Sequence, residues 1–265
     1  MDPELANMLS LEGRIAVVTG AATGIGEGIA TMLAAAGAAV TVADIDHVGA
    51  VRVADAIGGS AVHLDVTDPA TCAEVIGAVD GLDLLVNNAG TYHEAGSILD
   101  QPAESWQRSI DVNLAGLFNC AKPAAMSMVE AARPGTIVNI ASVDGLLPCL
   151  GTGYDSAKAG AIHFSRSLAL DLAPHGIRVN AVSPGHVPVP TLEKMRSGEI
   201  EPLWPQNPSK SGLMGPMMTQ RSSNIPLGRS ARVDEIARAV LYLSSEASSY
   251  VTGQNLTVDG GWTLV

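Results

Sequence analysis

A glycine-rich segment near the amino terminus, residues 19–26 (TGAATGIG), constrains the fold more than any other part of the sequence. It directly follows the apolar run 14–19 and precedes a helix-like stretch that begins near residue 25. Glycines let the backbone approach a pyrophosphate closely, and the amino-terminal end of the helix attracts its negative charge. A tight turn alone would also use glycine, but the position between a strand and a helix favours a dinucleotide-binding unit.

Apolar runs that suit short strands alternate with helix-like runs along the chain. Several apolar runs lack an in-out alternation of side chains, as expected for parallel strands covered on both faces. The pattern predicts an α/β fold, a doubly wound parallel sheet with helices on both faces. The expected strands are residues 14–19, 38–43, 61–64, 83–86, 136–140, 177–182 and 255–258, and the expected helices are residues 25–36, 48–57, 69–79, 104–131, 154–173 and 233–245.

The composition fits one domain that spans residues 1–265. Of these residues, 47% are hydrophobic and 16% are charged, which provides enough apolar surface for one large core. The formal net charge is -12, and an acidic surface repels phosphate backbones, so no nucleic-acid partner is expected. The sequence also lacks the basic run that binding to an anionic membrane would require.

Three widely spaced cysteines, Cys72, Cys120 and Cys149, occur without a CxxC pair. An odd number without a disulfide pattern indicates reduced thiols and a cytoplasmic location. No histidine or cysteine cluster has the spacing of metal ligands, so no metal is expected. Residues 1–12 lack a basic stretch followed by an apolar one, and we expect no signal peptide.

One segment, at about residues 186–224, breaks the alternation of strands and helices. It contains six prolines and is too long for an ordinary connection. Long loops of this kind are commonly lids or binding loops. We therefore expect a substrate-binding lid here, with short helices inside it.

The end of the second expected strand bears on the choice of cofactor. Asp44 stands there, and its carboxylate would accept hydrogen bonds from the adenosine ribose and repel a 2′-phosphate. No arginine or lysine occupies Thr23 or Ile45, where a binder of the 2′-phosphate would use one. These residues favour NAD over NADP, with a solvated acid as the alternative for Asp44. The expected cofactor contacts of the glycine-rich segment are Gly20, Thr23, Gly24, Ile25 and Gly26.

Two further strand ends carry candidate cofactor residues. Asp65 and Val66 follow the third expected strand and would bracket the adenine, although Asp65 also suits the approach to the next helix. Asn88 and Gly90 follow the fourth expected strand in the run NNAG. The asparagine amide would either tie neighbouring loops together or contact a ribose, and the residues leave both roles open.

Tyr154 and Lys158 stand four residues apart in a helix-like stretch. Residues i and i+4 lie on one helix face, so the lysine ammonium can sit near the tyrosine phenol. A nearby cation favours the phenolate and would lower the pKa of the tyrosine. A phenol of this kind can transfer a proton near neutral pH, which suggests, beside a nucleotide site, hydride chemistry on an alcohol or ketone. An ordinary surface pair on an amphipathic helix is the alternative.

Over roughly residues 11–263, the chain resembles the classical short-chain dehydrogenases/reductases. Any one of the matching motifs could arise by chance, but all of them in order are highly specific. The matches are residues 19–26, residues 87–90, Asn113, Ser142, Tyr154, Lys158, residues 183–185, residues 252–254 and residues 258–261.

The resemblance implies a Rossmann-like domain with a parallel sheet of about seven strands, commonly assembled as a homotetramer. Tyr154 would be the general acid/base on the substrate oxygen, and Lys158 would lower its pKa and hold the nicotinamide ribose. Ser142 would form a hydrogen bond with the substrate oxygen, and Asn113 would hold a water in a proton relay. These roles agree with the chemistry, because the negative charge that develops on oxygen needs a proton donor and a second hydrogen bond.

The resemblance also extends to the start of the expected lid. Pro184 and Gly185 match cofactor-binding positions, and the backbone of Val187 matches a contact with the nicotinamide carboxamide. Residues expected to face the substrate are Val143, Asp144, Leu147, Cys149, His93, His186 and the apolar lid residues Met195, Leu203, Trp204, Leu213, Met214, Met217 and Met218. They favour a fairly apolar substrate, cyclic compounds included. The alternatives are that the lid residues fill the lid or a subunit interface, and that both histidines are surface residues.

The leading interpretation is an NAD-dependent oxidoreductase that interconverts a secondary alcohol and a ketone. An NADPH-dependent ketoreductase is the alternative within the enzyme class, and Asp44 argues against it. A non-catalytic nucleotide-binding regulator is the alternative outside it. A regulator would have no need for the complete set of Asn113, Ser142, Tyr154 and Lys158.

Overall fold

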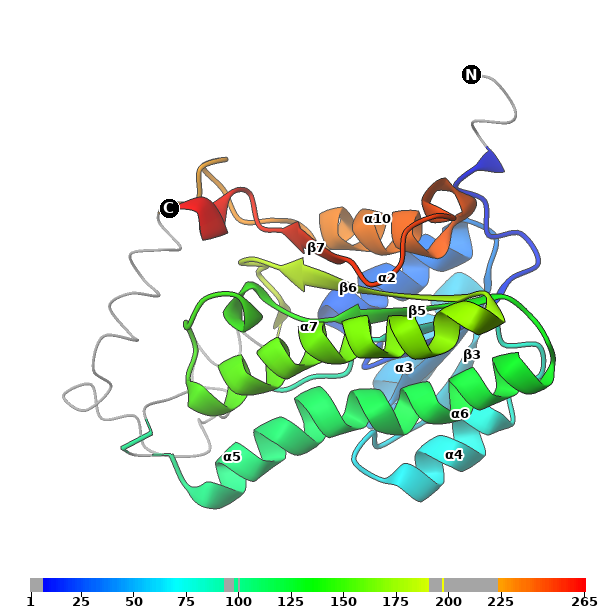
Figure 1. Ribbon diagram of the computed structural model, residues 1–265, viewed down its shortest axis with the longest axis horizontal. Helices are drawn as coiled ribbons and strands as arrows, with labels where there is room; N and C mark the ends of the chain where they lie inside the picture. Colours follow the sequence, from blue (N-terminus) through cyan, green and yellow to red (C-terminus); the bar gives the residue numbers. More distant parts are fainter. Residues whose placement is uncertain (1–6, 93–97, 100, 191–196, 198–223) are drawn as a thin grey trace.

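The computed structural model describes residues 7–92, 98–99, 101–190, 197 and 224–265 (Figure 1). Seven strands form one parallel sheet in the order β3-β2-β1-β4-β5-β6-β7. The order reverses between β1 and β4, which is where ligands of open α/β sheets bind. The expected doubly wound parallel sheet is therefore confirmed.

The observed elements lie close to the expected ones. The strands are β1 (Ile15–Thr19), β2 (Ala39–Asp44), β3 (Ser60–His63), β4 (Leu84–Asn87), β5 (Gly135–Ile140), β6 (Ile177–Pro184) and β7 (Asn255–Val258). The helices are α2 (Gly24–Ala35), α3 (His47–Ile57), α4 (Pro69–Gly77), α5 (Ala103–Ile110), α6 (Gly116–Glu130), α7 (Thr152–Leu172) and α10 (Val233–Ser244).

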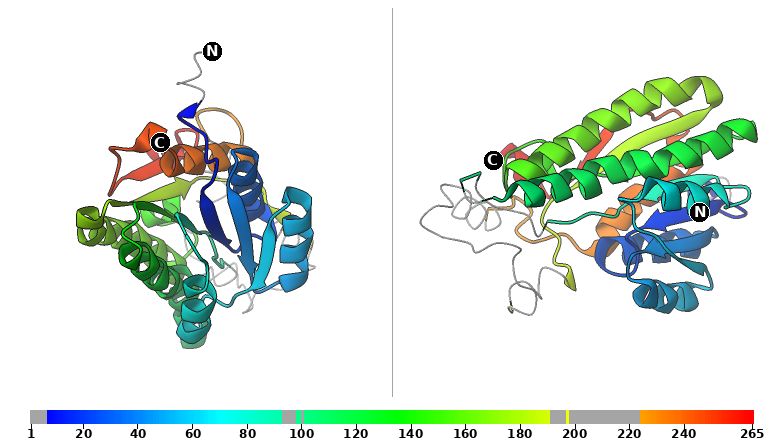
Figure 2. Two further views of the ribbon diagram at one scale, coloured as in Figure 1. Left: turned by 90° about the vertical axis from the view of Figure 1, so that its right-hand side faces the viewer. Right: turned by 90° about the horizontal axis from the view of Figure 1, so that it is seen from below.

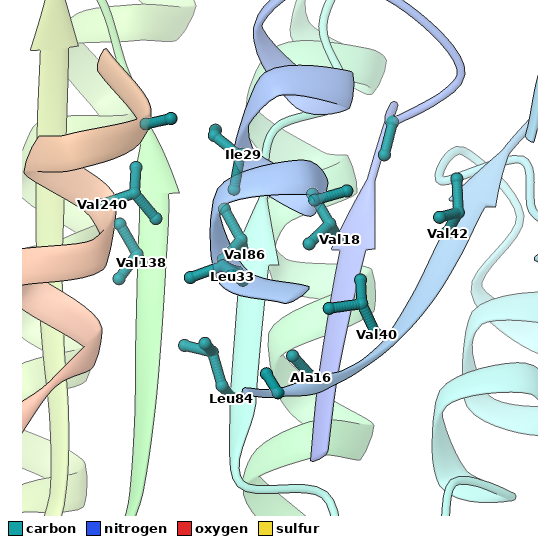
Figure 3. Close-up of a cluster of buried hydrophobic side chains, with 14 of the residues drawn as sticks. Ala16, Val18, Ile29, Leu33, Val40, Val42, Leu84, Val86, Val138 and Val240 are labelled. Carbon is teal, nitrogen blue, oxygen red and sulfur yellow. The ribbon is translucent and has the colours of Figure 1, made fainter. Parts of the chain in front are cut away.

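Helices cover both faces of the sheet (Figure 2). Alternate residues of β1 separate the two cores, because successive strand residues point to opposite faces. Ala16 and Val18 pack with α2, α3 and α10, in the cluster that Figure 3 shows. Val17 packs on the other side with α4, α6 and α7. Burial on both faces explains why the strands lack a polar side in the sequence.

Local chemistry explains two of the helix boundaries. Asp68 caps α4, because its carboxylate accepts hydrogen bonds from the backbone N–H groups of Ala70 and Thr71 at 2.9 and 3.3 Å. Pro69 then occupies the first turn, where a missing N–H has no consequence. Gly37 follows the end of α2 with a φ of 102°, a conformation that favours glycine.

The helix expected at 104–131 differs from the expectation in its interior. A π-helical turn, Asp111–Ala115, separates α5 from α6. Such turns insert one extra residue into a helix and often mark functional sites. Asn113 lies within this turn, so the irregularity changes the direction of a residue that the sequence singled out.

Two sequence expectations concern segments at the limits of the described residues. Most of the expected lid lies outside them, since only residues 186–190, 197 and 224 of that segment are described. In the part of the chain that the structure describes, no helix is long and apolar enough to cross a membrane.

Candidate active site

A cavity of about 1080 Å³ follows the carboxyl ends of the first six strands. It is lined by the residues that follow β1 to β6, together with the amino-terminal part of α7. All of the expected cofactor and catalytic residues line it, namely Gly20, Thr23, Gly24, Ile25, Gly26, Asp44, Asp65, Val66, Asn88, Gly90, Asn113, Ser142, Tyr154, Lys158, Pro184, Gly185 and Val187. The fold thus brings seventeen residues from distant parts of the sequence to one cavity.

The glycine-rich loop after β1 is packed against neighbouring backbone. Gly20 has a φ of 63°, and a Cβ atom there would lie 2.6 Å from the Cα of Ala89. A Cβ on Gly26 would overlap the carbonyl oxygen of Gly20. Both positions therefore require glycine for the loop to form at all. At these points the loop backbone packs directly against neighbouring backbone beside the cavity.

Asn88 fixes this loop to the end of β4. Its Nδ2 donates hydrogen bonds to the carbonyl oxygens of Thr19 and Gly20, at 3.0 and 2.8 Å. The backbone N–H groups of Asn88 and Ala89 both donate to Thr19 Oγ1 at 3.1 Å. Of the two roles left open by the sequence, the side-chain amide nitrogen of Asn88 performs the tying of loops.

Asp44 also braces the glycine-rich loop. Its Oδ2 accepts a hydrogen bond from the backbone N–H of Ala22 at 2.9 Å, and its Oδ1 accepts one from Asp46 at 2.9 Å. Behind the loop, Arg52 donates to the carbonyl oxygen of Ala22 at 2.8 Å and pairs with Glu27 at 2.8 Å. Sequence reasoning missed Arg52, and its place in α3 gives no signal of this contact.

Asp65 and Val66 form a fixed turn at the end of β3. Asp65 Oδ1 accepts hydrogen bonds from the backbone N–H and the hydroxyl of Thr67, at 2.9 and 2.7 Å. Asn119 of α6 donates to the carbonyl oxygen of Val66 at 2.9 Å. Asp65 and Val66 both line the cavity. One oxygen of the Asp65 carboxylate already accepts hydrogen bonds from Thr67.

Tyr154 and Lys158 lie on one buried face of α7. Their side chains belong to residues that are 9% and 3% exposed, and the Lys158 Nζ lies 5.6 Å from the centre of the Tyr154 ring. The same Nζ donates a hydrogen bond to the carbonyl oxygen of Ile140 at 2.9 Å. The alternative of an ordinary surface pair is therefore wrong, because both residues line the cavity and neither is exposed.

The pKa of Tyr154 differs from the sequence expectation. Burial raises the pKa of the phenol above its ordinary value, and the charge of Asp144 raises it further. Burial also lowers the pKa of Lys158 to about 8. Desolvation and the charge of Asp144 raise the pKa of Tyr154 in this structure, and the expected lowering by Lys158 stays a prediction.

Ser142 lies at the end of β5 and interacts closely with a carboxyl group. Its hydroxyl donates to Asp144 Oδ2 at 2.5 Å, and the backbone N–H of Asp144 donates to Ser142 Oγ at 3.1 Å. Burial raises the pKa of Asp144 to about 6. The sequence analysis placed Asp144 near the substrate but did not predict its hydrogen bonds with Ser142. These form because the 3₁₀ turn after β5 directs the Asp144 side chain toward Ser142.

Asn113 is fully buried and ties the π-helical turn after α5 to the loop after β4. Its Nδ2 donates to the carbonyl oxygens of Thr91 and Ser109 at 2.8 and 3.0 Å, and its Oδ1 accepts from the Thr91 N–H at 3.2 Å. Both side-chain donors are therefore used within the protein. A relay water at this residue would have to contact an oxygen atom of Asn113.

The substrate end of the cavity contains only some of the residues expected there. Asp144, Cys149 and His186 line it, whereas Val143 and Leu147 do not. Trp262 also lines it, although the sequence analysis did not single it out. His93 and the apolar lid residues from Met195 to Met218 lie outside the described residues.

Trp262 reaches the cavity from the carboxyl-terminal segment. Asp259 accepts hydrogen bonds from the backbone N–H groups of Gly261 and Thr263, at 2.9 and 2.7 Å, which fixes the turn that carries the indole. The Trp262 side chain packs with Val143, Cys149 and Ile225. Of this cluster, Cys149 and Trp262 line the cavity, so they contribute apolar surface to it.

Comparison with known proteins shows that the chain is similar to oxidoreductases along most of its length. A family model described as enoyl-(acyl carrier protein) reductase matches residues 20–263. The chain is 37% identical to the cis-4-hydroxycyclohexanecarboxylate dehydrogenase of Sinomonas cyclohexanicum, over 95% of this chain and 97% of that protein. It is 36% identical to the 3-oxoacyl-[acyl-carrier-protein] reductase FabG of Thermotoga maritima, over 97% of this chain and 100% of that protein.

Two solved structures are similar along almost the whole chain. One is a short-chain type dehydrogenase/reductase from Mycobacterium marinum, with a TM-score of 0.83, 35% identity and coverage of 98% of this chain and 100% of that one. The other, from Agrobacterium tumefaciens, is provisionally described as a 2-deoxy-d-gluconate 3-dehydrogenase with bound NADP. Its TM-score is 0.82, with 35% identity and the same coverage of both chains.

Proposed function

Since the chain belongs to the classical short-chain dehydrogenase/reductase family, we propose that it is an NAD-dependent oxidoreductase that interconverts a secondary alcohol and a ketone. Members of this family use a nicotinamide cofactor. One observation carries the proposal: Tyr154, Lys158 and Ser142 line the same cavity as the glycine-rich loop. Four residues of catalytic type in one cavity, with Asn113 the fourth, argue against a non-catalytic regulator.

The residues present fit a dinucleotide. The glycine-rich loop lines the cavity, is packed too tightly at Gly20 and Gly26 to hold a Cβ atom, and opens helix α2, whose amino terminus attracts phosphate charge. Asp44, Asp65 and Val66 would hold the adenosine end, whereas Lys158, Pro184, Gly185 and Val187 would hold the nicotinamide end. When bound, the cofactor supplies or accepts the hydride.

The chain itself supplies the proton transfer. In ketone reduction, Tyr154 gives its hydroxyl proton to the substrate oxygen, and the raised pKa keeps that proton in place at neutral pH. In alcohol oxidation, the phenolate of Tyr154 takes the alcohol proton, so oxidation should become faster as the pH rises. Ser142 contacts the substrate oxygen, and Lys158 orients the ribose from the neighbouring turn of α7.

NAD is the cofactor that Asp44 favours. A carboxylate at the end of β2 would accept hydrogen bonds from ribose hydroxyls, and its charge would repel a 2′-phosphate. Arg52, behind the loop, is paired with Glu27. The alternative is an NADPH-dependent ketoreductase, and one specific observation favours it: the similar Agrobacterium structure contains NADP.

Cys149, Leu150 and Trp262 line the cavity with apolar surface, which favours a fairly apolar alcohol, cyclic compounds included. The name of one relative, cis-4-hydroxycyclohexanecarboxylate dehydrogenase, agrees with the cyclic alcohol in this class, whereas its carboxylate adds a charge. We also propose that residues 1–265 form one catalytic domain, with residues 186–224 as its substrate-binding lid, because a single sheet carries both ends of the cavity. We also propose a cytoplasmic location, because Cys72, Cys120 and Cys149 are odd in number and include no CxxC pair.

The proposal is tested with Tyr154→Phe and a panel of secondary alcohols, cyclohexanol included, by following NADH absorbance. We expect the wild type to reduce NAD⁺ with at least one alcohol. Tyr154→Phe should lower kcat at least about 100-fold, because the proton acceptor is lost. NADH should bind the variant with little change in Kd, as measured by NADH fluorescence. Retained turnover in Tyr154→Phe would contradict the proposed acid/base.

A further inference from the structure

A buried carboxyl group lies beside the proposed catalytic residues, and the mechanism described so far does not use it. Asp144 belongs to the 3₁₀ turn Val143–Gly145, is 8% exposed, and lines the cavity. It contacts Ser142 twice: the Ser142 hydroxyl donates to Asp144 Oδ2 at 2.5 Å, and the Asp144 N–H donates to Ser142 Oγ at 3.1 Å. Whether the Ser142 hydroxyl can donate a hydrogen bond to a ligand therefore depends on Asp144.

The groups around Asp144 come from three directions. From α7, the charge of Asp155 raises the pKa of Asp144, and the charge of Asp144 in turn raises the pKa values of Tyr154 and Lys158. From the loop between β5 and α7, the Cys149 thiol lowers the pKa of Asp144. From the loop after β4, the charge of Tyr92 raises the pKa of Tyr154, which neighbours Asp144.

The balance of these effects brings Asp144 into an accessible pH range. Burial is the largest contribution, and it raises the pKa of the carboxyl group to about 6. The hydrogen bond from Ser142 opposes this rise, because it stabilises the carboxylate. Asp144 can therefore change its charge under conditions in which enzymes are ordinarily assayed.

The consequence for Ser142 follows from counting protons. A serine hydroxyl has one proton to donate, and a carboxylate can only accept. While Asp144 is ionised, the Ser142 hydroxyl donates its proton to Asp144. Ser142 can then only accept a hydrogen bond from a substrate. When Asp144 takes up a proton from solvent, the new O–H group can donate to Ser142 Oγ. The Ser142 proton is then released to donate elsewhere.

Alcohols and ketones respond differently to this change. In the complex that forms while Tyr154 is still protonated, an alcohol hydroxyl can accept from Tyr154 and donate to Ser142 Oγ, whereas a ketone oxygen can only accept. We propose that Asp144 is a positioning residue that sets whether Ser142 accepts a hydrogen bond from an alcohol or donates one to a ketone. This inference rests on the proposed function, because it assumes an alcohol–ketone pair as substrates.

The first experiment measures KM for cyclohexanone and cyclohexanol, or for another pair that the panel identifies, between about pH 5 and pH 8. In the wild type, the ratio of the ketone KM to the alcohol KM should rise with pH about fivefold, the equivalent of one hydrogen bond. In Asp144→Asn, which is isosteric and cannot ionise, the ratio should not change with pH. Asp171→Asn, an exposed site near the far end of α7, is the matched control and should behave like the wild type.

A second experiment needs neither substrate nor cofactor. Infrared titration of the full chain should reveal a carboxylic acid band that is absent in Asp144→Asn. Ser142→Ala should move its midpoint to higher pH, because the hydrogen bond that lowers the pKa of Asp144 is lost. If no alcohol in the panel is turned over but this shift occurs, the proposed function fails and the link between Asp144 and Ser142 stands. A midpoint that Ser142→Ala leaves unchanged, or a pH-dependent KM ratio in Asp144→Asn, overturns the inference.

Discussion

Lys158 is a charged residue in a place that disfavours charge. Its side chain is 3% exposed, and its described polar contact is the hydrogen bond to the Ile140 carbonyl oxygen. Burial accordingly lowers its pKa to about 8. A lysine held in this way destabilises the fold at neutral pH, and natural proteins tolerate such costs mainly at functional sites. The unfavourable placement is itself an argument that Lys158 acts on a ligand.

We predict that Lys158→Met folds more stably than the wild type at pH 7, by about 1–3 kcal/mol, while losing turnover. The folded-state pKa lies below that of the unfolded chain, so wild-type stability rises with pH above about 8. The advantage of the variant should therefore shrink between pH 7 and about pH 9. Urea denaturation at both pH values measures this. An advantage that grows with pH would falsify the prediction.

Asp44 is the second residue whose chemistry can be tested alone. It lines the cavity at the end of β2, where its Oδ2 braces the glycine-rich loop through Ala22 and its Oδ1 accepts from the backbone N–H of Asp46. We predict that Asp44→Ala lowers the preference for NADH over NADPH at least about tenfold, which corresponds to about 1.4 kcal/mol. Fluorescence titration gives the two Kd values. Asp55→Ala, an exposed site on α3 with the same change of charge, should leave the preference unaltered.

Two results would count against the role of Asp44. One is a wild type that binds NADPH more tightly than NADH. The other is an Asp44→Ala variant in which both Kd values change by the same factor, because this would indicate a loss of loop structure without any effect on selectivity.

At the scale of elements, a chain of buried amides fixes α7 to the sheet. Asn87 of β4 donates to Asn139 Oδ1 at 2.9 Å, Asn139 of β5 donates to Ser165 Oγ at 2.9 Å, and Ser165 donates to the Ala161 carbonyl oxygen at 2.8 Å. Register pairs Asn87 directly with Asn139. Since α7 carries Tyr154 and Lys158, these contacts help set the position of both residues over the strand ends.

We predict that Asn139→Ala lowers the free energy of unfolding by about 1–3 kcal/mol, because buried hydrogen-bonding groups on Asn87 and Ser165 lose a partner. It should also lower kcat, since α7 loses a contact with β5. Thermal denaturation and steady-state kinetics measure the two effects. Asn7→Ala, at an exposed position, is the control. A variant as stable as the wild type would show that α7 is held by its apolar contacts alone.

The element boundaries were largely predictable from the sequence. Apolar runs, Pro69 and Gly37 are local signals, and local signals set the ends of strands and helices. The π-helical turn Asp111–Ala115 had no such signal, because it depends on how Asn113 bonds to a loop more than twenty residues earlier. The link between Ser142 and Asp144 escaped prediction for a related reason, since it depends on the turn after β5 and on burial.

At the scale of the molecule, apolar side chains remain exposed on the outer side of α5, α6 and α7. Helices α5 and α6 run beside α7 (Figure 1), and Trp106, Phe118, Met126 and Leu170 are 40%, 53%, 52% and 79% exposed. Large exposed apolar residues that gather on neighbouring elements often mark subunit interfaces. This distribution is typical of a subunit interface, and the homotetramer stays a prediction.

We predict a mass of four chains, 4 × 27.1 kDa, by size-exclusion chromatography with light scattering. The double variant Phe118→Glu and Met126→Glu should lower this mass, because four copies of each new charge would be buried at interfaces. Val48→Glu, at an exposed apolar position on α3, should leave the mass unchanged. A wild type with the mass of one chain contradicts the tetramer.

The sequence by itself determined the architecture and pointed to the glycine-rich loop, Tyr154 and Lys158, whereas Ser142 and Asn113 came from the family resemblance. The architecture, the loop and the pair depend on local patterns: apolar runs, glycines between a strand and a helix, and the spacing of Tyr154 and Lys158. Only the tertiary structure decided their electrostatics. Burial raises the pKa of Tyr154 and lowers that of Lys158, and it brings Asp144 to Ser142. The physical reason is that desolvation and hydrogen bonding depend on which groups surround a residue in space, and sequence spacing does not specify those neighbours.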